Sequence, residues 1–379
     1  MPIWQCDYFI FAMGNDVMRV LVGLVCGLSL VWIGCGDDTA LGNGNASGDC
    51  ESNVLAGDYT IRSAQEAIAL ERKGGCNYTI AGNLEITRTQ LRIFEHMNEL
   101  GAVGGDVNIY DNEELESFEG LGDLAMVGGD VNIYDNEVLK NLEGLSFLQN
   151  VSGNVNVFRN DKLANIDGLF KLETVAGDVR VNNNNKLLQL DGLFGLVAVT
   201  GSLVIEFNPS IELIEDLSNL RTVGGDLIIG NNLRLEKIED MSGLQEVGGN
   251  LNIGENARLD MIEDMSGLGS VGQDLNIFSN QRLTSLVGLA NLALVGGNLN
   301  IYNNEKLTDL EGLESLVQVG KDLNVYGNEK LADLIGLANL VTIGAKVFIV
   351  ENTNLPTSEA LALADRAAAG EVSIQNNKN

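Results

Sequence analysis

The sequence predicts a mainly β fold, a right-handed parallel β solenoid of about twelve coils that is closed by short helical caps. Three observations predict it: an internal repeat, an alternation of aliphatic and polar residues within each repeat, and one asparagine that returns in every regular repeat. Each repeat supplies one coil, and the coils share a single core because each is too short to fold alone.

The repeat is clearest in the string Val-Gly-Gly-Asp-Val-Asn-Ile-Tyr, which covers residues 103–110 and recurs at 127–134. The opening Val or Ile then returns at the same interval of 24 residues, at positions 151, 175, 199, 223, 247, 271, 295, 319 and 343. A degenerate copy begins at Ile80. With the opening residue numbered as place 1, aliphatic residues occupy mainly places 1, 5, 7, 13, 16, 19 and 22.

Places 4 to 8 predict a strand with one buried face, because aliphatic places 5 and 7 alternate with polar or aromatic places 4, 6 and 8. The later spacing of three residues predicts turns that bring the chain back. A glycine pair at places 2 and 3, as in Gly104-Gly105, predicts a tight turn with unusual dihedral angles.

Place 10 predicts a buried asparagine ladder, because an amide directly after a strand can satisfy backbone groups of its own coil and of its neighbours. The residue is asparagine in all eleven regular coils, at Asn112, Asn136, Asn160, Asn184, Asn208, Asn232, Asn256, Asn280, Asn304, Asn328 and Asn352.

The N-terminal region predicts export. A basic residue, an apolar run of about fourteen residues and small residues before Cys35 have the layout of a secretion signal, and the run is short for a membrane span. The ending Trp-Ile-Gly-Cys resembles a bacterial lipobox, which implies that Cys35 is lipidated. The predicted segments are a signal region (1–34, with Met18 as the true start), lipidated cysteine and flexible tether (35–49), N-terminal cap (50–79), solenoid (80–352) and C-terminal cap (353–379).

Two cysteines follow the tether, Cys50 and Cys76, and both lie in the predicted N-terminal cap. In an exported protein such a pair predicts a disulfide, since a metal site needs more ligands and the chain has a single histidine, His96.

Over residues 50–379 the sequence resembles the receptor L-domain, a relative of leucine-rich repeats found in growth-factor receptor ectodomains and in bacterial surface lipoproteins. The Gly-Gly-Asp-Leu-Asn-Ile strand, the place-10 asparagine, the Leu-x-x-Leu-x-Gly-Leu-x-x-Leu tail and the helical cap ending at Cys76 carry the resemblance. It implies a binding module, but no ligand residues carry over because no ligand motif is shared.

The charge narrows the choice of partner. Lys and Arg number 23 against 53 Asp and Glu, so the net charge is -30, which repels nucleic acid and anionic lipid headgroups. We therefore expect no nucleic-acid partner, no cofactor, membrane contact only through the lipid, and an envelope or extracellular protein or glycan as ligand.

The candidate binding face consists of places 6 and 8 of the predicted strands. Place 6 is asparagine in two runs, with Asn108, Asn132, Asn300 and Asn324 among them, and place 8 is aromatic at Tyr110, Tyr134, Phe158, Phe278, Tyr302 and Tyr326. Identical residues also stack well between coils, so packing alone is the alternative explanation of both columns.

An acidic column repeats Ile-Glu-Asp at Asp216, Asp240 and Asp264. Calcium would relieve the repulsion between these carboxylates, and a solvated acidic edge is the alternative.

Catalysis is the least favoured class, because a polysaccharide-acting site needs dissimilar residues that converge where the repeat breaks. The clearest break, Val199–Leu220, carries Glu206, Phe207 and Pro209, with Arg180 and Arg221 nearby. We predict no catalytic residues. The expected protein is a non-catalytic binding lipoprotein of the cell envelope, at the outer membrane or cell surface, and a structural spacer or surface coat is the alternative.

Overall fold

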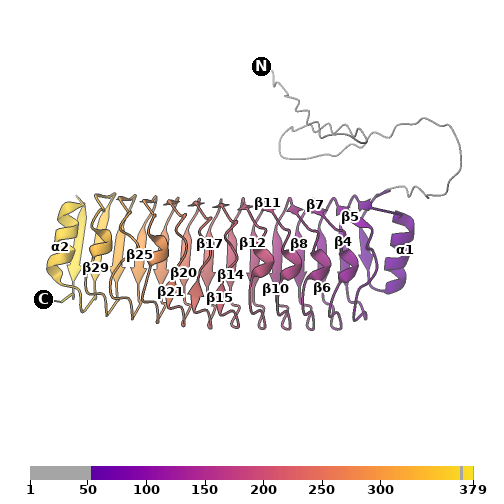
Figure 1. Ribbon diagram of the computed structural model, residues 1–379, viewed down its shortest axis with the longest axis horizontal. Helices are drawn as coiled ribbons and strands as arrows, with labels where there is room; N and C mark the ends of the chain where they lie inside the picture. The colour runs from indigo at the N-terminus through magenta and orange to yellow at the C-terminus, as the bar shows by residue number, and fades with distance from the viewer. Residues whose placement is uncertain (1–52, 368–369, 379) are drawn as a thin grey trace, which may run out of the picture. The chain divides into compact units, whose positions relative to one another are not determined.

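The computed structural model describes residues 53–367 and 370–378. These residues form a right-handed parallel β solenoid, in which the coils stack in one row between helix α1 (Ala64–Gly74) and helix α2 (Thr357–Arg366) (Figure 1). The predicted fold class is therefore confirmed. The signal region, Cys35, the tether and Cys50 lie outside the described residues. No helix in the described part of the chain is long and apolar enough to cross a membrane.

The largest sheet, called sheet 1 here, contains the strands that the alternation at places 5 to 8 predicted. All neighbours pair in parallel, one coil apart, as Val155 pairs with Val179. Its strands are, in order, β2 (Tyr59–Ile61), β4 (Leu84–Thr87), β6 (Val107–Tyr110), β8 (Val131–Tyr134), β10 (Val155–Phe158), β12 (Val179–Asn182), β14 (Leu203–Glu206), β17 (Leu227–Gly230), β20 (Leu251–Gly254), β23 (Leu275–Phe278), β25 (Leu299–Tyr302), β27 (Leu323–Tyr326), β29 (Lys346–Val350) and β30 (Glu371–Gln375).

A second sheet, sheet 2, is built mostly from very short strands around place 1 of each coil. These are β1 (Val54–Leu55), β3 (Tyr78–Ile80), β5 (Leu100–Val103), β7 (Met126–Val127), β9 (Asn150–Val151), β11 (Thr174–Val175), β13 (Ala198–Val199), β16 (Thr222–Val223), β19 (Glu246–Val247), β22 (Ser270–Val271), β24 (Leu294–Val295), β26 (Gln318–Val319) and β28 (Thr342–Ile343).

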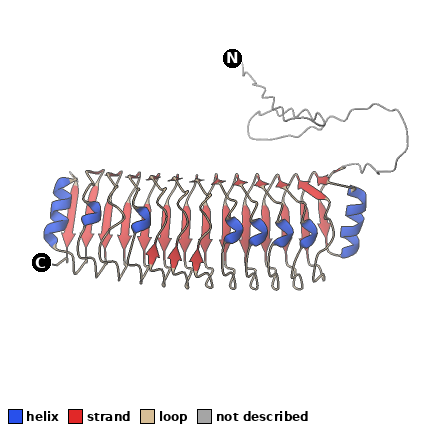
Figure 2. Ribbon diagram, viewed as in Figure 1, coloured by secondary structure: helices blue, strands red, loops and turns tan. Residues whose placement is uncertain are grey.

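The third side of the coils changes along the molecule (Figure 2). Six coils carry a 3-10 helix there, η1 (Glu119–Leu121), η2 (Glu143–Leu145), η3 (Asp167–Leu169), η4 (Asp191–Leu193), η5 (Val287–Leu289) and η6 (Ile335–Leu337). Three central coils instead form sheet 3, from β15 (Leu213–Ile214), β18 (Lys237–Ile238) and β21 (Met261–Ile262).

Place 18 explains this change. It is glycine in every coil with a 3-10 helix, because the backbone of the preceding coil leaves no room for a side chain: a Cβ at Gly168 would overlap the carbonyl group of Leu142. The three coils of sheet 3 have aspartate instead, and Asp216 and Asp240 adopt positive φ angles of 64° and 57°. Asp216 and Asp240 therefore require a different turn.

The core is the stacked set of aliphatic places that the repeat predicted. In the coil that opens at Val295, the residues Val295, Leu299, Ile301, Leu307, Leu310, Leu313 and Leu316 are all 0% exposed. This column continues from Leu55 near the first helix to Ala367 at the end of the second. Stacking thus closes the core above and below each coil.

The predicted asparagine ladder is present, and all eleven of its members are fully buried. Asn256 shows the pattern: its Oδ1 accepts from the backbone N–H of Asn232 at 3.0 Å, and its Nδ2 donates to the carbonyl of Ile229 at 2.9 Å. Its own N–H donates to Oδ1 of Asn280 at 3.1 Å. The ladder ends on Asn377, whose Oδ1 accepts from the N–H of Asn352 at 3.1 Å.

A second ladder, which the repeat did not lead us to predict, joins the residues at place 4. The backbone N–H of Asp130 donates to Oδ1 of Asp106 at 2.8 Å, and the same bond recurs as far as Lys346. It explains the neighbouring glycines, since a Cβ at Gly129 would overlap Oδ1 of Asp106. Glycine at places 2 and 3 is needed for close approach, and the predicted unusual dihedral angles are wrong, as Gly104 and its equivalents have no positive φ.

Candidate binding surface

The outward side chains of sheet 1 form the surface that the sequence predicted as the binding face. The asparagines at place 6 and the rings at place 8 are only half-buried, because each is covered by its neighbours in the stack and open on the outside. The surface contains two groups of stacked rings. The N-terminal aromatic patch consists of Tyr110, Tyr134 and Phe158, and the C-terminal aromatic patch of Phe278, Tyr302 and Tyr326.

The ring geometry decides what each patch offers. In the N-terminal patch the centroids of Tyr110 and Tyr134 are 5.1 Å apart with planes at 7°, and those of Tyr134 and Phe158 are 4.9 Å apart with planes at 1°. Parallel rings in contact lie about 3.5 to 4 Å apart, so these rings must be displaced sideways. Each ring is therefore largely covered by its neighbours, and it exposes only an edge and part of one face to solvent.

The tyrosine hydroxyls remain proton donors. Burial raises the pKa of Tyr134, and the nearby Tyr110 and Asp111 raise it further. Burial likewise raises the pKa of Tyr302 and of Tyr326. A phenol whose pKa rises from about 10 stays protonated at neutral pH, so both patches offer hydrogen-bond donors beside apolar rings.

The asparagines at place 6 form two short ladders next to the rings. Nδ2 of Asn132 donates to Oδ1 of Asn108 at 2.9 Å, and Nδ2 of Asn324 donates to Oδ1 of Asn300 at 2.7 Å. Arg180, Val204 and Ile228 separate the two ladders. Packing between coils therefore accounts for much of this column, as the alternative explanation expected.

The gap between the patches is lined by small or charged residues at place 8. Gly254 lies under the ring of Phe278, which occupies the space of a side chain, and the Glu206 carboxylate lies over Gly230. Burial raises the pKa of Glu206, and the charge of Glu255 adds to the effect. The two aromatic patches are thus separate surfaces.

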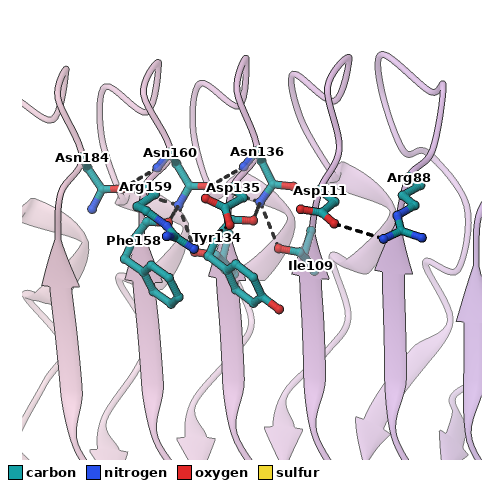
Figure 3. Close-up of polar contacts among 11 residues, drawn as sticks. Arg88, Ile109, Asp111, Tyr134, Asp135, Asn136, Phe158, Arg159, Asn160 and Asn184 are labelled. Carbon is teal, nitrogen blue, oxygen red and sulfur yellow. Dashed lines mark hydrogen bonds and ion pairs between the residues drawn. The ribbon is translucent and has the colours of Figure 1, made fainter.

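Beside the N-terminal patch lies a groove, which sequence reasoning missed (Figure 3). It follows the turn after sheet 1, where place 9 has a positive φ in consecutive coils: 54° at Asp111, 54° at Asp135 and 53° at Arg159. Arg159 Nη2 lies 2.7 Å from Asp135 Oδ2, and Arg88 Nη2 lies 3.6 Å from Asp111 Oδ2 (Figure 3). The order Arg, Asp, Asp, Arg at place 9 was the signal that could have revealed it.

The acidic column is only partly a cluster of carboxylates. Asp191, Glu215 and Asp216 each offer an oxygen within 4.8 Å of the others. Burial raises the pKa of Asp191 and of Glu215, and their negative neighbours raise both further. Calcium binding stays a prediction, and the structure adds Asp191 to the candidate ligands.

Glu239, Glu263 and Asp264 of the column have partners of their own. Lys237 Nζ lies 3.2 Å from Glu263 Oε1 and 3.8 Å from Glu239 Oε2, and Oδ1 of Asp264 accepts from the Ser266 hydroxyl at 2.8 Å. In this part of the column, Lys237 supplies a positive charge that relieves the repulsion between the carboxylates, which is the role that the sequence analysis gave to calcium.

The residues at the break in the repeat lie on different sheets. Glu206 ends β14 of sheet 1, whereas Arg221 directly precedes β16 of sheet 2. Arg180 Nη2 pairs with Asp178 Oδ2 at 2.5 Å. His96 lies in the irregular loop of the first coil. The prediction of no catalytic residues stays a prediction, as does the disulfide between Cys76, which follows α1, and Cys50.

Comparison with known proteins adds no identity: no family model matches the chain, and no curated protein is significantly similar to it.

Proposed function

We propose that the protein is a non-catalytic, lipid-anchored binding protein of the cell envelope, which presents the outer face of sheet 1 to a protein or glycan partner. The observation that carries the proposal is the pair of aromatic patches. Partly exposed aromatic rings with donor hydroxyls are typical of interfaces, because one end of the side chain is apolar and the other can bind water or a polar partner. We also propose that the protein belongs to the receptor L-domain group, whose members are binding modules.

The test is capture of a partner from cell-envelope extract and from a glycan panel by the purified protein. We expect a specific partner to be retained by the wild type and lost from a variant with Tyr110, Tyr134, Tyr302 and Tyr326 changed to Ala. A matched variant outside sheet 1, Phe147→Ala with Phe170→Ala, should retain it, since these exposed side chains belong to the turns that follow η2 and η3. Capture that is indifferent to the tyrosines would reject the proposal.

A structural spacer or surface coat is the second candidate, and the two continuous ladders favour it. They tie every regular coil to the next, so the coils form a stiff stack. A spacer depends on its length, whereas a binder depends on its surface. Deletion of two whole central coils would favour the spacer if the shortened protein still captured the partner but no longer supported the cell envelope.

A further inference from the structure

The groove beside the N-terminal aromatic patch is a mixed-charge surface with an acidic excess. Two arginines, Arg88 and Arg159, line it against six carboxylates, Asp111, Glu113, Glu114, Asp135, Glu137 and Asp161. The arginines are already paired with Asp111 and Asp135. In the described part of the chain, no ion pair involves Glu113, Glu114 or Glu137, so three carboxylates of the groove are available to a cation.

One buried group also lies in the wall of the groove. Thr89 lines it, is 3% exposed, and donates its backbone N–H to Oδ1 of Asn112 at 3.0 Å, at the start of the asparagine ladder. Its hydroxyl, however, has no hydrogen-bond partner among the described residues. An unpaired buried hydroxyl is costly, so this wall of the groove contains an unsatisfied polar group.

The aromatic patch continues this surface. Phe158 and Tyr134 directly precede Arg159 and Asp135 in the chain, and the Arg159 guanidinium lies 5.3 Å from the Phe158 ring centroid (Figure 3). Rings and carboxylates side by side bind cationic side chains, since the ring attracts the cation and the carboxylate pairs with it. The net charge of -30 repels anionic ligands and attracts basic ones.

We propose that this groove binds an extended basic segment of a protein partner. The inference rests on the proposed binding function and names the chemistry of its ligand. The place-9 residues from Arg88 to Asn183 cover four steps between coils of about 4.8 Å, or about 19 Å, which is the length of about six extended residues. Lysine or arginine side chains of such a segment pair with Glu113, Glu114 and Glu137.

The test is calorimetric titration of the purified protein with oligolysine, with oligoglutamate and an uncharged Gly-Ser peptide as controls. The groove variant changes Glu113, Glu114 and Glu137 to Gln. The matched variant changes Glu305, Glu329 and Glu351 to Gln, which removes as many charges from the corresponding turns of the C-terminal coils. We expect the groove variant to bind oligolysine about tenfold more weakly, or about 1.4 kcal/mol, and the matched variant to change affinity less than about twofold.

Equal weakening in both variants would show that oligolysine follows the net charge, and would overturn the groove. Absence of oligolysine binding by the wild type would overturn it as well, and so would a neutral glycan that binds in place of the peptide and is lost in the groove variant. Melting curves of both variants check that they are folded. Tyrosine-dependent capture that survives in the groove variant would leave the proposed function standing without this inference.

Discussion

The four coils that open at Val103, Val127, Val151 and Val175 and the three that open at Val199, Val223 and Val247 are built on one frame and differ mainly at two of its places. Both groups have the same buried aliphatic places and the same buried asparagine. At place 18 the first group has glycine and a 3-10 helix, and the second has aspartate and sheet 3. At place 8 the first group has mostly rings, and the second glutamate and glycine.

The difference shows that one stacking frame can carry unlike surfaces. The buried asparagine ladder and the buried aliphatic places recur in every regular coil, because they satisfy each coil in the same way. The outward places are free to vary, and they vary in blocks of neighbouring coils, since each side chain packs on the same place of the coils above and below. Function therefore depends on the outward residues of a block of neighbouring coils, whereas stability depends on the core and the ladders that all coils share.

The largest effect should come from the shared frame. We expect Asn160→Ala and Asn256→Ala each to lower the free energy of unfolding by about 2 to 6 kcal/mol, because each leaves a buried N–H and a buried carbonyl unpaired at about 1 to 3 kcal/mol each. Denaturant titration measures both. Asn300→Ala, in the half-buried outer ladder, should cost only about 0.5 to 1.5 kcal/mol per lost bond. Clearly unequal costs at Asn160 and Asn256 would break the idea of a shared frame.

The second effect separates the two groups of coils. Gly168→Ala should cost about 1 to 3 kcal/mol, because its Cβ would overlap the carbonyl of Leu142. Asp240→Gly, at the same place of a central coil, should be neutral or slightly stabilising, since glycine adopts the φ of 57° without strain. Thermal melts of the two variants compare them. A strongly destabilised Asp240→Gly would mean that the aspartate side chain, and not the turn, holds sheet 3.

Much of the frame could be predicted because it recurs. The alternation at places 5 to 8 gave the strands of sheet 1, and an invariant polar residue directly after a strand had few explanations besides a ladder. The place-4 ladder was missed since aspartate, asparagine and serine share the place, and the repeat does not reveal that their oxygens accept the same bond. The role of Gly129 was misassigned for the same reason: the contact that excludes a side chain comes from the previous coil.

The candidate sites were harder to predict, because they depend on distances between coils. The aromatic column was visible in the sequence, but the displaced stacking that limits its exposed faces was not. The sequence did not reveal that Asp191 lies beside Glu215 and Asp216. Asp191 belongs to the last coil with a 3-10 helix before sheet 3, and only the stacked structure shows how that coil aligns with the first coil of sheet 3. The groove was not predicted because its arginines, Arg88 and Arg159, pair with aspartates that lie one coil away.

The smallest predicted effect is electrostatic and lies where the two groups of coils meet. Burial raises the pKa of Asp191, and Asp216 and Asp167 raise it further, so the folded protein holds this proton more tightly than the unfolded chain does. Stability from this group is therefore fully present below the unfolded pKa of about 3.9 and is lost as the pH rises through the folded pKa. We expect Asp191→Asn to raise Tm at pH 7 and to leave it unchanged near pH 3.

The control for this measurement is Asp123→Asn, which removes the same charge from an exposed turn. It separates the local effect from the net charge of -30, which also disfavours the compact state at neutral pH. If both variants raise Tm equally, the charge of Asp191 is no more destabilising than an ordinary surface charge. The acidic edge is then solvated. If only Asp191→Asn raises Tm, calcium should raise Tm of the wild type more than that of this variant, because the same carboxylates would then bind the ion.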